Sequence, residues 1–409
     1  MRPDACRVSQ VLPDGLLLRS AKEADLDQIG ELLVERGEPA DALDHRLVVE
    51  DPDAGLGSCA VVVDGDRVVS TATLLDEVLV LEGLPIPAGQ VELVATDRAY
   101  EGRGLVRALM AWAHARSAAR GHLAQVMIGI PYFYRKFGYQ YAIELPHNRA
   151  VTSVPPAPED HLVRPAGPAD IAAMAALQEA TQRGFDLRMP RSAACWRWLV
   201  ARTGSTQLLV ERAGVPVGTA RITPPDEDVL LGEIAVEEPS AVSALLAYSA
   251  KSAKTSELKV KGRPGSLAGA ALEPYLADAP PLAECYYARV PDARALLEHL
   301  RPVLSARLQR AGLGAGTGEV VVSFFGHHVR MPYVETVVQA VNLGGVLPGP
   351  ASVGGAGVAP DLVGPLLFGQ QGIIGLALRH PDVYPGPNRD LMGALFPPLS
   401  ADLLTFYLP

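Results

Sequence analysis

A glycine-rich turn between a predicted strand and a predicted helix contains the residues best suited to bind an anion. The strand is expected over residues 91–96, and the helix follows Gly104. Such a turn exposes backbone N–H groups at a helix N-terminus, where the helix dipole adds partial positive charge. Gly102 and Gly104 permit the turn and a close approach of ligand to backbone, and Arg103 and Arg107 can contact phosphate oxygens. The spacing predicts a pyrophosphate site, although Gly-x-Gly by itself also fits an ordinary strand-to-helix turn.

A cluster of aromatic residues follows the next predicted strand. Residues 125–130 have the composition of a buried strand, and after them comes Pro131-Tyr-Phe-Tyr134-Arg-Lys-Phe-Gly-Tyr139. The rings suit an apolar substrate pocket, and Tyr134 can act as a proton donor or serve only to pack among its neighbours. Trp112, on the helix after the glycine-rich turn, is expected in the core.

The two segments together resemble the GNAT (N-acetyltransferase) superfamily. In that superfamily a strand, turn and helix cradle the pyrophosphate of coenzyme A, and a Tyr-x-x-Phe-Gly-Tyr/Phe segment follows the next strand. The signature Arg/Gln-x-x-Gly-x-Gly/Ala corresponds here to Glu101-Gly-Arg-Gly104-Leu-Val106, which departs from it at Glu101 and Val106. The carboxylate of Glu101 would repel a pyrophosphate unless it points to solvent.

The resemblance implies an acetyl-CoA-dependent N-acetyltransferase with acetyl-CoA as co-substrate and no metal ion. It implies that Tyr134 protonates the leaving thiolate. The residues it implies to contact acetyl-CoA are Val94, Ala95 and Thr96 on the pantetheine arm, Gly102, Arg103, Gly104, Leu105, Val106 and Arg107 at the pyrophosphate, and Gly129 and Ile130.

Over its whole length the chain resembles one GNAT subgroup, the enhanced-intracellular-survival (Eis) type. That subgroup has a competent GNAT domain, a degenerate second GNAT domain and a C-terminal domain like a sterol carrier protein, and it uses a C-terminal carboxylate to deprotonate the amine. The resemblance places this role on Pro409, which follows an apolar tail. Glu92, before the cofactor strand, is a second candidate base, a contact for the substrate ammonium, or a solvent-facing strand residue.

An internal repeat supports two copies of one α+β unit. Arg19 and Asp25 recur as Arg164 and Asp170, 145 positions later, each at a predicted strand-to-helix junction. A hairpin around an Asp-Gly turn at residues 59–69 recurs at 208–218. The second copy has Glu237-Glu238-Pro239 at its turn, so it is not expected to bind coenzyme A.

The third part of the chain has a different pattern. Apolar spacing predicts a helix over 292–308 that Pro302 ends or kinks, and strands are expected at 319–325 and 334–341. His327 and His328 are adjacent in a strand-like run, where they cannot readily chelate one ion.

The expected fold class is α/β (α+β), with tandem GNAT folds, each a mixed central sheet flanked by helices, and a sterol-carrier-protein-like α/β domain. Two Pro-rich stretches, 154–160 and 263–281, are interpreted as linkers or loops. The expected domains are residues 1–153 (N-terminal GNAT, cofactor-binding), 154–280 (degenerate GNAT) and 281–409 (sterol-carrier-like, ending in the active site).

Composition limits the class of protein. The 409 residues carry a net charge of −10, so duplex nucleic acid is an unfavourable partner. No apolar run approaches the ~20 residues of a membrane span, and the first residues do not form a secretion signal. Four scattered cysteines argue against a zinc site and a disulfide framework. We therefore expect a cytoplasmic enzyme with reduced thiols.

Several functions stay open at this stage. The expected acceptor is a primary amine of a small molecule or peptide, with no nucleic acid or membrane partner. The resemblance also implies a homo-oligomer. The alternatives are a transferase of a longer acyl group, and an acyl- or lipid-binding protein that uses the sterol-carrier-like domain.

Overall fold

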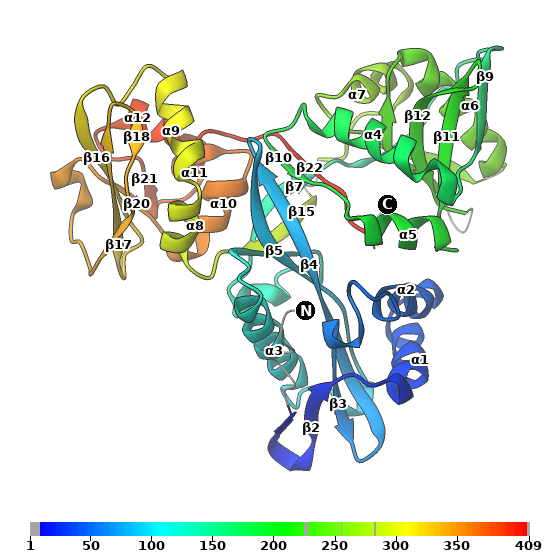
Figure 1. Cartoon of the computed structure of the whole chain (residues 1–409), viewed down its shortest axis with the longest axis horizontal. Coiled ribbons are helices and arrows are strands. Elements are labelled where there is room, and N and C mark those ends of the chain that lie inside the picture. The colour runs from blue at the N-terminus through cyan, green and yellow to red at the C-terminus, as the bar shows by residue number, and fades with distance from the viewer. Residues whose placement is uncertain (1–8, 225–227, 255, 282–283, 407–409) are drawn as a thin grey trace.

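The chain forms three lobes that meet at a central junction (Figure 1). The computed structural model describes residues 9–224, 228–254, 256–281 and 284–406. Each lobe contains one β-sheet. The first sheet has ten strands, and each of the other two has six.

The first lobe is built on the ten-stranded sheet. In spatial order its strands are β1 (Ser9–Val11), β2 (Leu17–Ser20), β3 (Cys59–Asp64), β4 (Arg67–Leu81), β5 (Leu84–Thr96), β6 (Ala124–Met127), β15 (Glu284–Arg289) and β7 (Gln140–Leu145), with β10 (Leu187–Met189) on β4 and β22 (Ala401–Leu403) on β10. Its helices are α1 (Leu26–Arg36), α2 (Pro39–Val49) and α3 (Leu105–Ala119).

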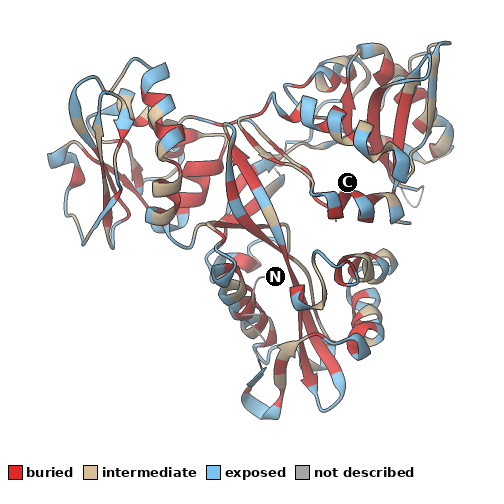
Figure 2. Cartoon of the chain, viewed as in Figure 1, coloured by how far each residue is buried: buried red, intermediate tan, exposed pale blue. Residues whose placement is uncertain are grey.

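Helices cover both faces of this sheet because its strands are apolar on both sides. Along β3, Ala60 and Val62 share a core with α3, whereas Val61 and Val63 share a core with α1. Successive strand residues face opposite sides, so β3 is buried from both directions (Figure 2). Trp112 of α3 is 3% exposed, which confirms its expected place in the core.

The long hairpin of β4 and β5 runs from the first lobe to the junction (Figure 1). The register shifts between Thr71 and Thr73 of β4, and the extra residue lies in a bulge of β5, where Leu93 has a positive φ of 49°. β5 pairs in parallel with β6 only over Ala88–Gln90. Beyond that point the two strands separate, and the separation opens a gap in the sheet.

The first sheet takes strands from distant parts of the chain. β15, just after the expected domain boundary at residue 281, lies between β6 and β7 and is antiparallel to both. Near the C-terminus, β22 pairs in parallel with β10, which itself pairs with β4. Three expected domains therefore contribute strands to one sheet.

The second lobe repeats the topology of the first on a smaller scale. Its strands in spatial order are β8 (Asn148–Ala150), β14 (Glu257–Lys261), β13 (Asp228–Val236), β12 (Val215–Ile222), β11 (Thr206–Arg212) and β9 (His161–Pro165), and its helices are α4 (Ile171–Gln182), α5 (Ala193–Ala201), α6 (Pro239–Ala253) and α7 (Leu267–Leu272). β8 precedes the expected boundary at residue 153 but pairs in the second sheet.

The structure confirms the internal repeat at atomic detail. Arg19 and Arg164 each make two side-chain hydrogen bonds to the aspartate six positions later, Asp25 and Asp170. Each aspartate also accepts a backbone N–H from three residues earlier, at 2.7 and 2.8 Å. The two copies thus share one device at the start of the first helix.

The third lobe contains the remaining strands and helices. Its strands are β18 (Val337–Val338), β17 (His328–Val334), β16 (Thr317–Ser323), β20 (Ala356–Val358) and β21 (Val383–Tyr384), with β19 (Asn342–Gly344) on β17, and its helices are α8 (Ala293–His299), α9 (Arg301–Arg310), α10 (Val363–Phe368), α11 (Gly372–Arg379) and α12 (Arg389–Leu395). The break between α8 and α9 confirms the interruption expected at Pro302. One hydrophobic core joins this lobe to the junction end of the first sheet.

Three expectations about local structure were wrong. The second Pro-rich stretch contains α7, whose Ala268 and Leu272 are buried. The strand expected over 334–341 is a turn with positive φ at Glu335 and Thr336, followed by the two-residue β18. β6 ends at Met127, three residues before the expected end, because the chain must turn there toward the aromatic segment.

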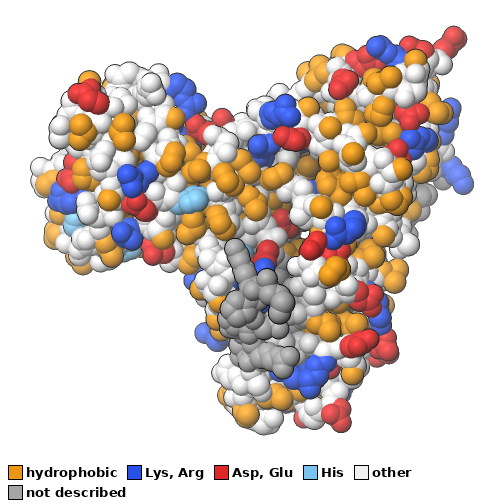
Figure 3. All heavy atoms as spheres, viewed as in Figure 1, with side chains coloured by type: hydrophobic (Ala, Val, Ile, Leu, Met, Phe, Trp, Pro, Cys, Tyr) orange, Lys and Arg blue, Asp and Glu red, His pale blue; other side chains and the backbone are white. Residues whose placement is uncertain are grey.

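On the face shown in Figure 3, acidic and basic side chains are interspersed among hydrophobic ones. In the described part of the chain, no helix is long and apolar enough to cross a membrane. The cysteines within that part, Cys59, Cys195 and Cys285, are free thiols.

Candidate functional site

A cavity of about 530 Å³ lies where β5 separates from β6 and reaches the N-terminus of α3. The cavity brings together residues from four separate parts of the first lobe. Its lining comprises Arg36, Val94, Ala95, Thr96, Tyr100, Glu101, Gly102, Gly104, Leu105, Val106, Arg107, Ile130, Phe133, Tyr134, Lys136 and Phe137.

The glycine-rich turn forms one end of this cavity. Gly102 and Gly104 have φ angles of 77° and 80°, and Gly104 is the N-cap of α3. A Cβ at either glycine would meet open space, so the backbone conformation is what requires glycine. The first N–H groups of α3 lack an acceptor within the helix, as at any helix N-terminus, and such groups can bind an anion.

Most of the residues predicted to bind acetyl-CoA line the cavity. Val94, Ala95, Thr96, Gly102, Gly104, Leu105, Val106, Arg107 and Ile130 all do so, together with Tyr134. Arg103 does not, because its guanidinium lies over the ring of Tyr100 at 4.7 Å and donates to the Ala99 carbonyl at 3.4 Å.

Gly129 contributes to the site by the absence of a side chain. A Cβ at this position would lie 2.3 Å from Cε2 of Tyr134, so only glycine lets the tyrosine ring approach the backbone after β6. The ring of Tyr134 is also enclosed by Phe133 and Tyr139, with centroid separations of 5.1 and 6.5 Å. Its position is therefore fixed by packing, and its role as a proton donor stays a prediction.

Two tyrosines that sequence reasoning missed hold the loop before Tyr134. Tyr287 of β15 donates to the Ile130 carbonyl at 3.2 Å and contacts the hydroxyl of Tyr141 at 2.8 Å. Tyr141 in turn accepts the N–H of Tyr132, which has a positive φ of 67°. The ring of Tyr287 lies 6.0 Å from that of Tyr134. No local sequence signal could reveal this contact, since it depends on the insertion of β15.

Burial favours the protonated forms of the Tyr134 phenol and of the nearby Glu92 carboxyl group. Burial, with the nearby Glu92 carboxylate, raises the pKa of Tyr134 to about 12. Glu92 keeps some contact with solvent, but desolvation of its carboxyl group and the charge of Glu77 raise its pKa to about 8. Gln90 donates to the Glu92 carboxylate and, at 2.9 Å, to the hydroxyl of Thr405. Glu92 therefore sits beside the C-terminal segment.

That segment is held by a group of arginines from the second lobe. Arg221 is fully buried and donates to the Phe406 carbonyl at 3.0 Å, and Arg202 donates to the same carbonyl at 3.1 Å. The ring of Phe406 packs edge-on against Trp198 at 5.5 Å. Pro409 lies outside the described residues.

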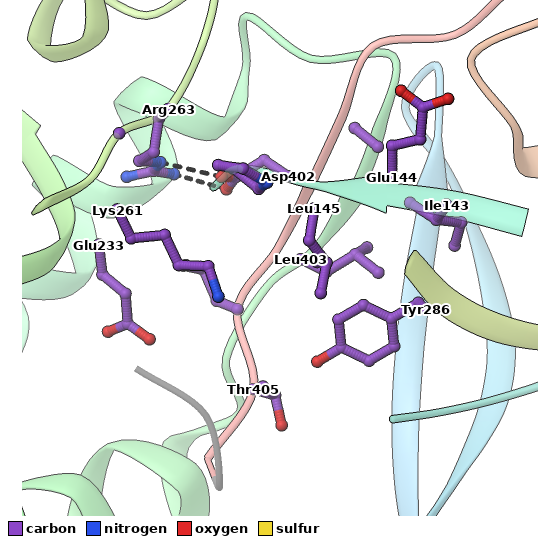
Figure 4. A pocket seen from close by; sticks show the side chains of 14 residues that line it. Ile143, Glu144, Leu145, Glu233, Lys261, Arg263, Tyr286, Asp402, Leu403 and Thr405 are labelled. Atoms are coloured by element: carbon purple, nitrogen blue, oxygen red, sulfur yellow. Dashed lines mark hydrogen bonds and ion pairs between the residues drawn. The ribbon is translucent and has the colours of Figure 1, made fainter. Parts of the chain in front are cut away.

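A smaller cavity of about 50 Å³ lies at the junction, where the C-terminal segment passes the ends of β7 and β14. Figure 4 shows Lys261, Glu233 and Tyr286 around it, with the ion pair of Arg263 and Asp402 at one side. Arg263 Nη2 lies 2.5 Å from Asp402 Oδ2. This buried pair fixes the C-terminal segment to the second lobe just before it reaches Gln90.

The equivalent helix N-terminus in the second lobe is closed by its own side chains. Glu238 is the N-cap of α6, and its carboxylate binds His161 at 2.8 Å and Arg212 at 2.6 Å. β13 keeps a bulge like that of β5, with a positive φ of 55° at Glu233. The strand geometry is thus retained without a glycine-rich turn.

Comparison with known proteins gives one family and a set of similar folds. Residues 18–142 match the acetyltransferase (GNAT) domain family. A relative from Streptomyces avermitilis, named an uncharacterized N-acetyltransferase, is 28% identical over 225 residues. The alignment spans 49% of this chain and 55% of that relative, so the chain matches about half of the relative's length.

Solved structures share the fold over nearly the whole chain. A GCN5-related N-acetyltransferase from Anabaena variabilis has a TM-score of 0.68 at 15% identity, covering 95% of this chain and 99% of that one. Eis1 from Mycobacterium abscessus has a TM-score of 0.59 at 15% identity, covering 95% and 97%. At such identities the likeness concerns the three-lobed fold.

Proposed function

We propose that the protein transfers an acetyl group from acetyl-CoA to a primary amine, because residues 18–142 match the acetyltransferase (GNAT) domain family. The observation that carries the proposal is a single cavity that extends from the anion-binding turn at Gly102 and Gly104 to Tyr134. The site fits coenzyme A, since α3 presents unbonded N–H groups and the separated strands leave room for an extended arm beside Val94–Thr96.

The chain's own residues supply binding and proton transfer. Bound acetyl-CoA provides an activated acetyl group, and the turn and the edge of β5 orient it beside Tyr134. Tyr134, whose pKa of about 12 keeps it protonated, is the donor to the departing thiolate. Direct transfer in a ternary complex needs no nucleophilic side chain.

We propose two candidate bases for the proton that the amine must lose, of which only the Pro409 carboxylate corresponds to the Eis-type mechanism. The base is the carboxylate of Pro409 or the carboxyl group of Glu92, and the bond between Gln90 and Thr405 supports both by bringing the C-terminal segment to the strand of Glu92. A few residues added after Pro409 would disable the first base and leave the second intact, whereas Glu92→Gln does the reverse.

The test of the proposed function has two steps. Calorimetry with acetyl-CoA should give saturable binding, and a set of primary amines should then be screened for thiol release. Acetyl-, butyryl- and octanoyl-CoA compared with the best amine separate acetyl transfer from transfer of longer acyl groups. Absence of acyl-CoA binding would overturn the proposal.

We also propose that the third lobe, with α8 to α12 packed on its six-stranded sheet, is the sterol-carrier-like domain of the Eis type. Binding of a fluorescent fatty acid to the full chain, compared in the presence and absence of acetyl-CoA, tests whether that lobe retains a lipid site. A signal lost on adding acetyl-CoA would place the lipid in the first lobe instead.

A further inference from the structure

Glu101, which departs from the GNAT signature, is paired with a cation from another element. Its carboxylate accepts a hydrogen bond from Arg36 Nη2 at 2.5 Å. Arg36 is the last residue of α1 and lies 65 positions before Glu101 in the sequence. Both residues line the cavity, with 27% of the Arg36 side chain and 53% of the Glu101 side chain exposed. Glu101 thus does not simply point to solvent.

A second ion pair joins the same two segments with the opposite polarity. Arg98, in the turn, lies 3.9 Å from Glu35 of α1, and 74% of the Arg98 side chain is exposed. The residues that line the cavity include Arg36 but neither Arg98 nor Glu35. The two ion pairs therefore join the same segments, but only the Arg36–Glu101 pair lines the cavity. The Arg98–Glu35 pair serves as a matched control.

Of the two paired residues, Arg36 is the one whose charge attracts a phosphate in the cavity. An unpaired carboxylate at residue 101 would oppose any phosphate bound at the turn. Glu101 is the one hydrogen-bond partner that the described residues provide for Arg36. A guanidinium has five N–H donors, so most of the Arg36 fork stays available to a ligand in the cavity. Arg103, the arginine between the two glycines of the turn, lies over the ring of Tyr100 instead.

We propose that Arg36 binds a phosphate group of the acyl donor and that Glu101 is a positioning residue that aims Arg36 into the cavity. The inference rests on the acetyl-CoA site proposed above. It identifies a cation contributed by α1, and it explains why a carboxylate is tolerated at residue 101. The phosphate could belong to the pyrophosphate or to the 3′-phosphate of the donor.

The experiment compares three donors in wild type and three variants. The donors are acetyl-CoA, 3′-dephospho-acetyl-CoA and S-acetylpantetheine, which lacks both phosphate groups. Arg36→Ala should raise Kd and KM for acetyl-CoA ~10- to 30-fold, as expected for a charge-assisted hydrogen bond. It should leave kcat and the KM for S-acetylpantetheine unchanged. An effect that is lost with the dephospho donor assigns Arg36 to the 3′-phosphate, and an effect that persists assigns it to the pyrophosphate.

The other variants separate phosphate binding from a structural link. Glu101→Gln should change Kd less than ~3-fold, because it removes a repulsive charge while its side-chain carbonyl can still accept a hydrogen bond from Arg36. Arg98→Ala should leave every donor constant at the wild-type value. Equal weakening by Arg36→Ala and Glu101→Gln, or equal loss with S-acetylpantetheine, would make the pair a structural link and overturn the inference.

Thermal stability and two further variants, Arg36→Lys and Gly104→Asp, separate loss of phosphate binding from loss of folding or of the whole site. Thermal unfolding of each variant shows whether the first lobe is intact, and Arg36→Lys should recover part of the acetyl-CoA affinity because it keeps the charge. If Gly104→Asp abolishes acetyl-CoA binding while Arg36→Ala matches wild type, the inference fails and the proposed function stands. If wild type does not bind acetyl-CoA, both fail.

Discussion

The first and second lobes share one topology but differ at the N-terminus of the helix that follows the bulged strand. Both begin with the same arginine–aspartate device, and both have a bulged strand with a positive φ, at Leu93 and Glu233. They diverge at the helix that follows. α3 starts at Gly104 beside a cavity, whereas α6 starts at Glu238, whose carboxylate is bound by His161 and Arg212. The strand geometry is thus the same in both lobes, although α6 has Glu238 where α3 has a glycine at its N-cap.

The segments after the parallel strand pair diverge too. After β6 the first lobe has Gly129 and Tyr134 in contact, and after β14 the second lobe has Arg263 paired with Asp402. The second copy therefore holds the C-terminal segment at the position where the first copy has Tyr134, the proposed proton donor. The second lobe thus anchors the segment that reaches Gln90.

The largest effect is expected from the tyrosine that only the first lobe has. Tyr134→Phe keeps the enclosed ring but removes the proton donor, so kcat should fall ~10²- to 10⁴-fold. Stopped-flow or steady-state thiol release measures this, and calorimetry should show unchanged acetyl-CoA affinity. Wild-type kcat in the variant would leave Tyr134 a packing residue and remove the main chemical difference between the lobes.

A substitution in the turn tests the other difference. Gly104→Asp forces a side chain onto a φ of 80° and places a carboxylate at the N-terminus of α3, so acetyl-CoA affinity should fall at least ~100-fold. Gly214→Asp is the matched control, since Gly214 has a φ of 79° in the β11–β12 turn and a Cβ there also meets open space. Similar losses of affinity in both variants would point to general destabilisation.

The pH dependence of the rate tests Glu92. Its pKa of about 8 means that the carboxyl group is protonated below pH 8 and becomes a base above it. If Glu92 takes the amine proton, kcat/KM rises with pH through a midpoint near 8 and levels off above it, and Glu92→Gln flattens the profile. Glu77→Gln removes a charge that raises the pKa of Glu92, so the rise should move to lower pH. A profile unchanged in Glu92→Gln assigns the base to the Pro409 carboxylate.

A smaller effect should be shared by the two copies. Asp25→Asn and Asp170→Asn each remove an ion pair and weaken a cap, costing on the order of 1 kcal/mol of local stability. Arg164 and the Gly167 N–H lower the pKa of Asp170 to about 2, so its contribution is present above the unfolded pKa and disappears as pH falls toward 2. Hydrogen exchange of α1 and α4 amides measures both. Unequal effects would show that the repeated device is used differently.

The smallest effect is expected at the closed helix of the second lobe. Glu238→Gln removes the charge that binds His161 and Arg212 but leaves the first lobe untouched, so Kd for acetyl-CoA should equal the wild-type value. Calorimetry should give one site per chain in both proteins. Weaker binding in the variant, or a second site in wild type, would mean that the second copy is not degenerate.

Local features of the sequence were enough for several parts of this structure. The two glycines and the flanking strand and helix predicted the turn at Gly104, because positive φ and helix initiation depend on neighbouring residues alone. The repeated arginine–aspartate spacing predicted the two copies, and Pro302 predicted the break between α8 and α9, since a missing N–H interrupts a helix wherever the helix lies.

The tertiary structure alone decided how those parts combine. Alternating apolar residues show which faces of β15 are buried but not which strands flank it, so its insertion between β6 and β7 left no mark in the sequence. The contact of Tyr287 with the Ile130 carbonyl follows from that insertion. The pairing of Arg36 with Glu101 needed the end of α1 to meet a turn 65 residues away. Side chains far apart in sequence carry no shared periodicity, and only the folded chain sets their distance.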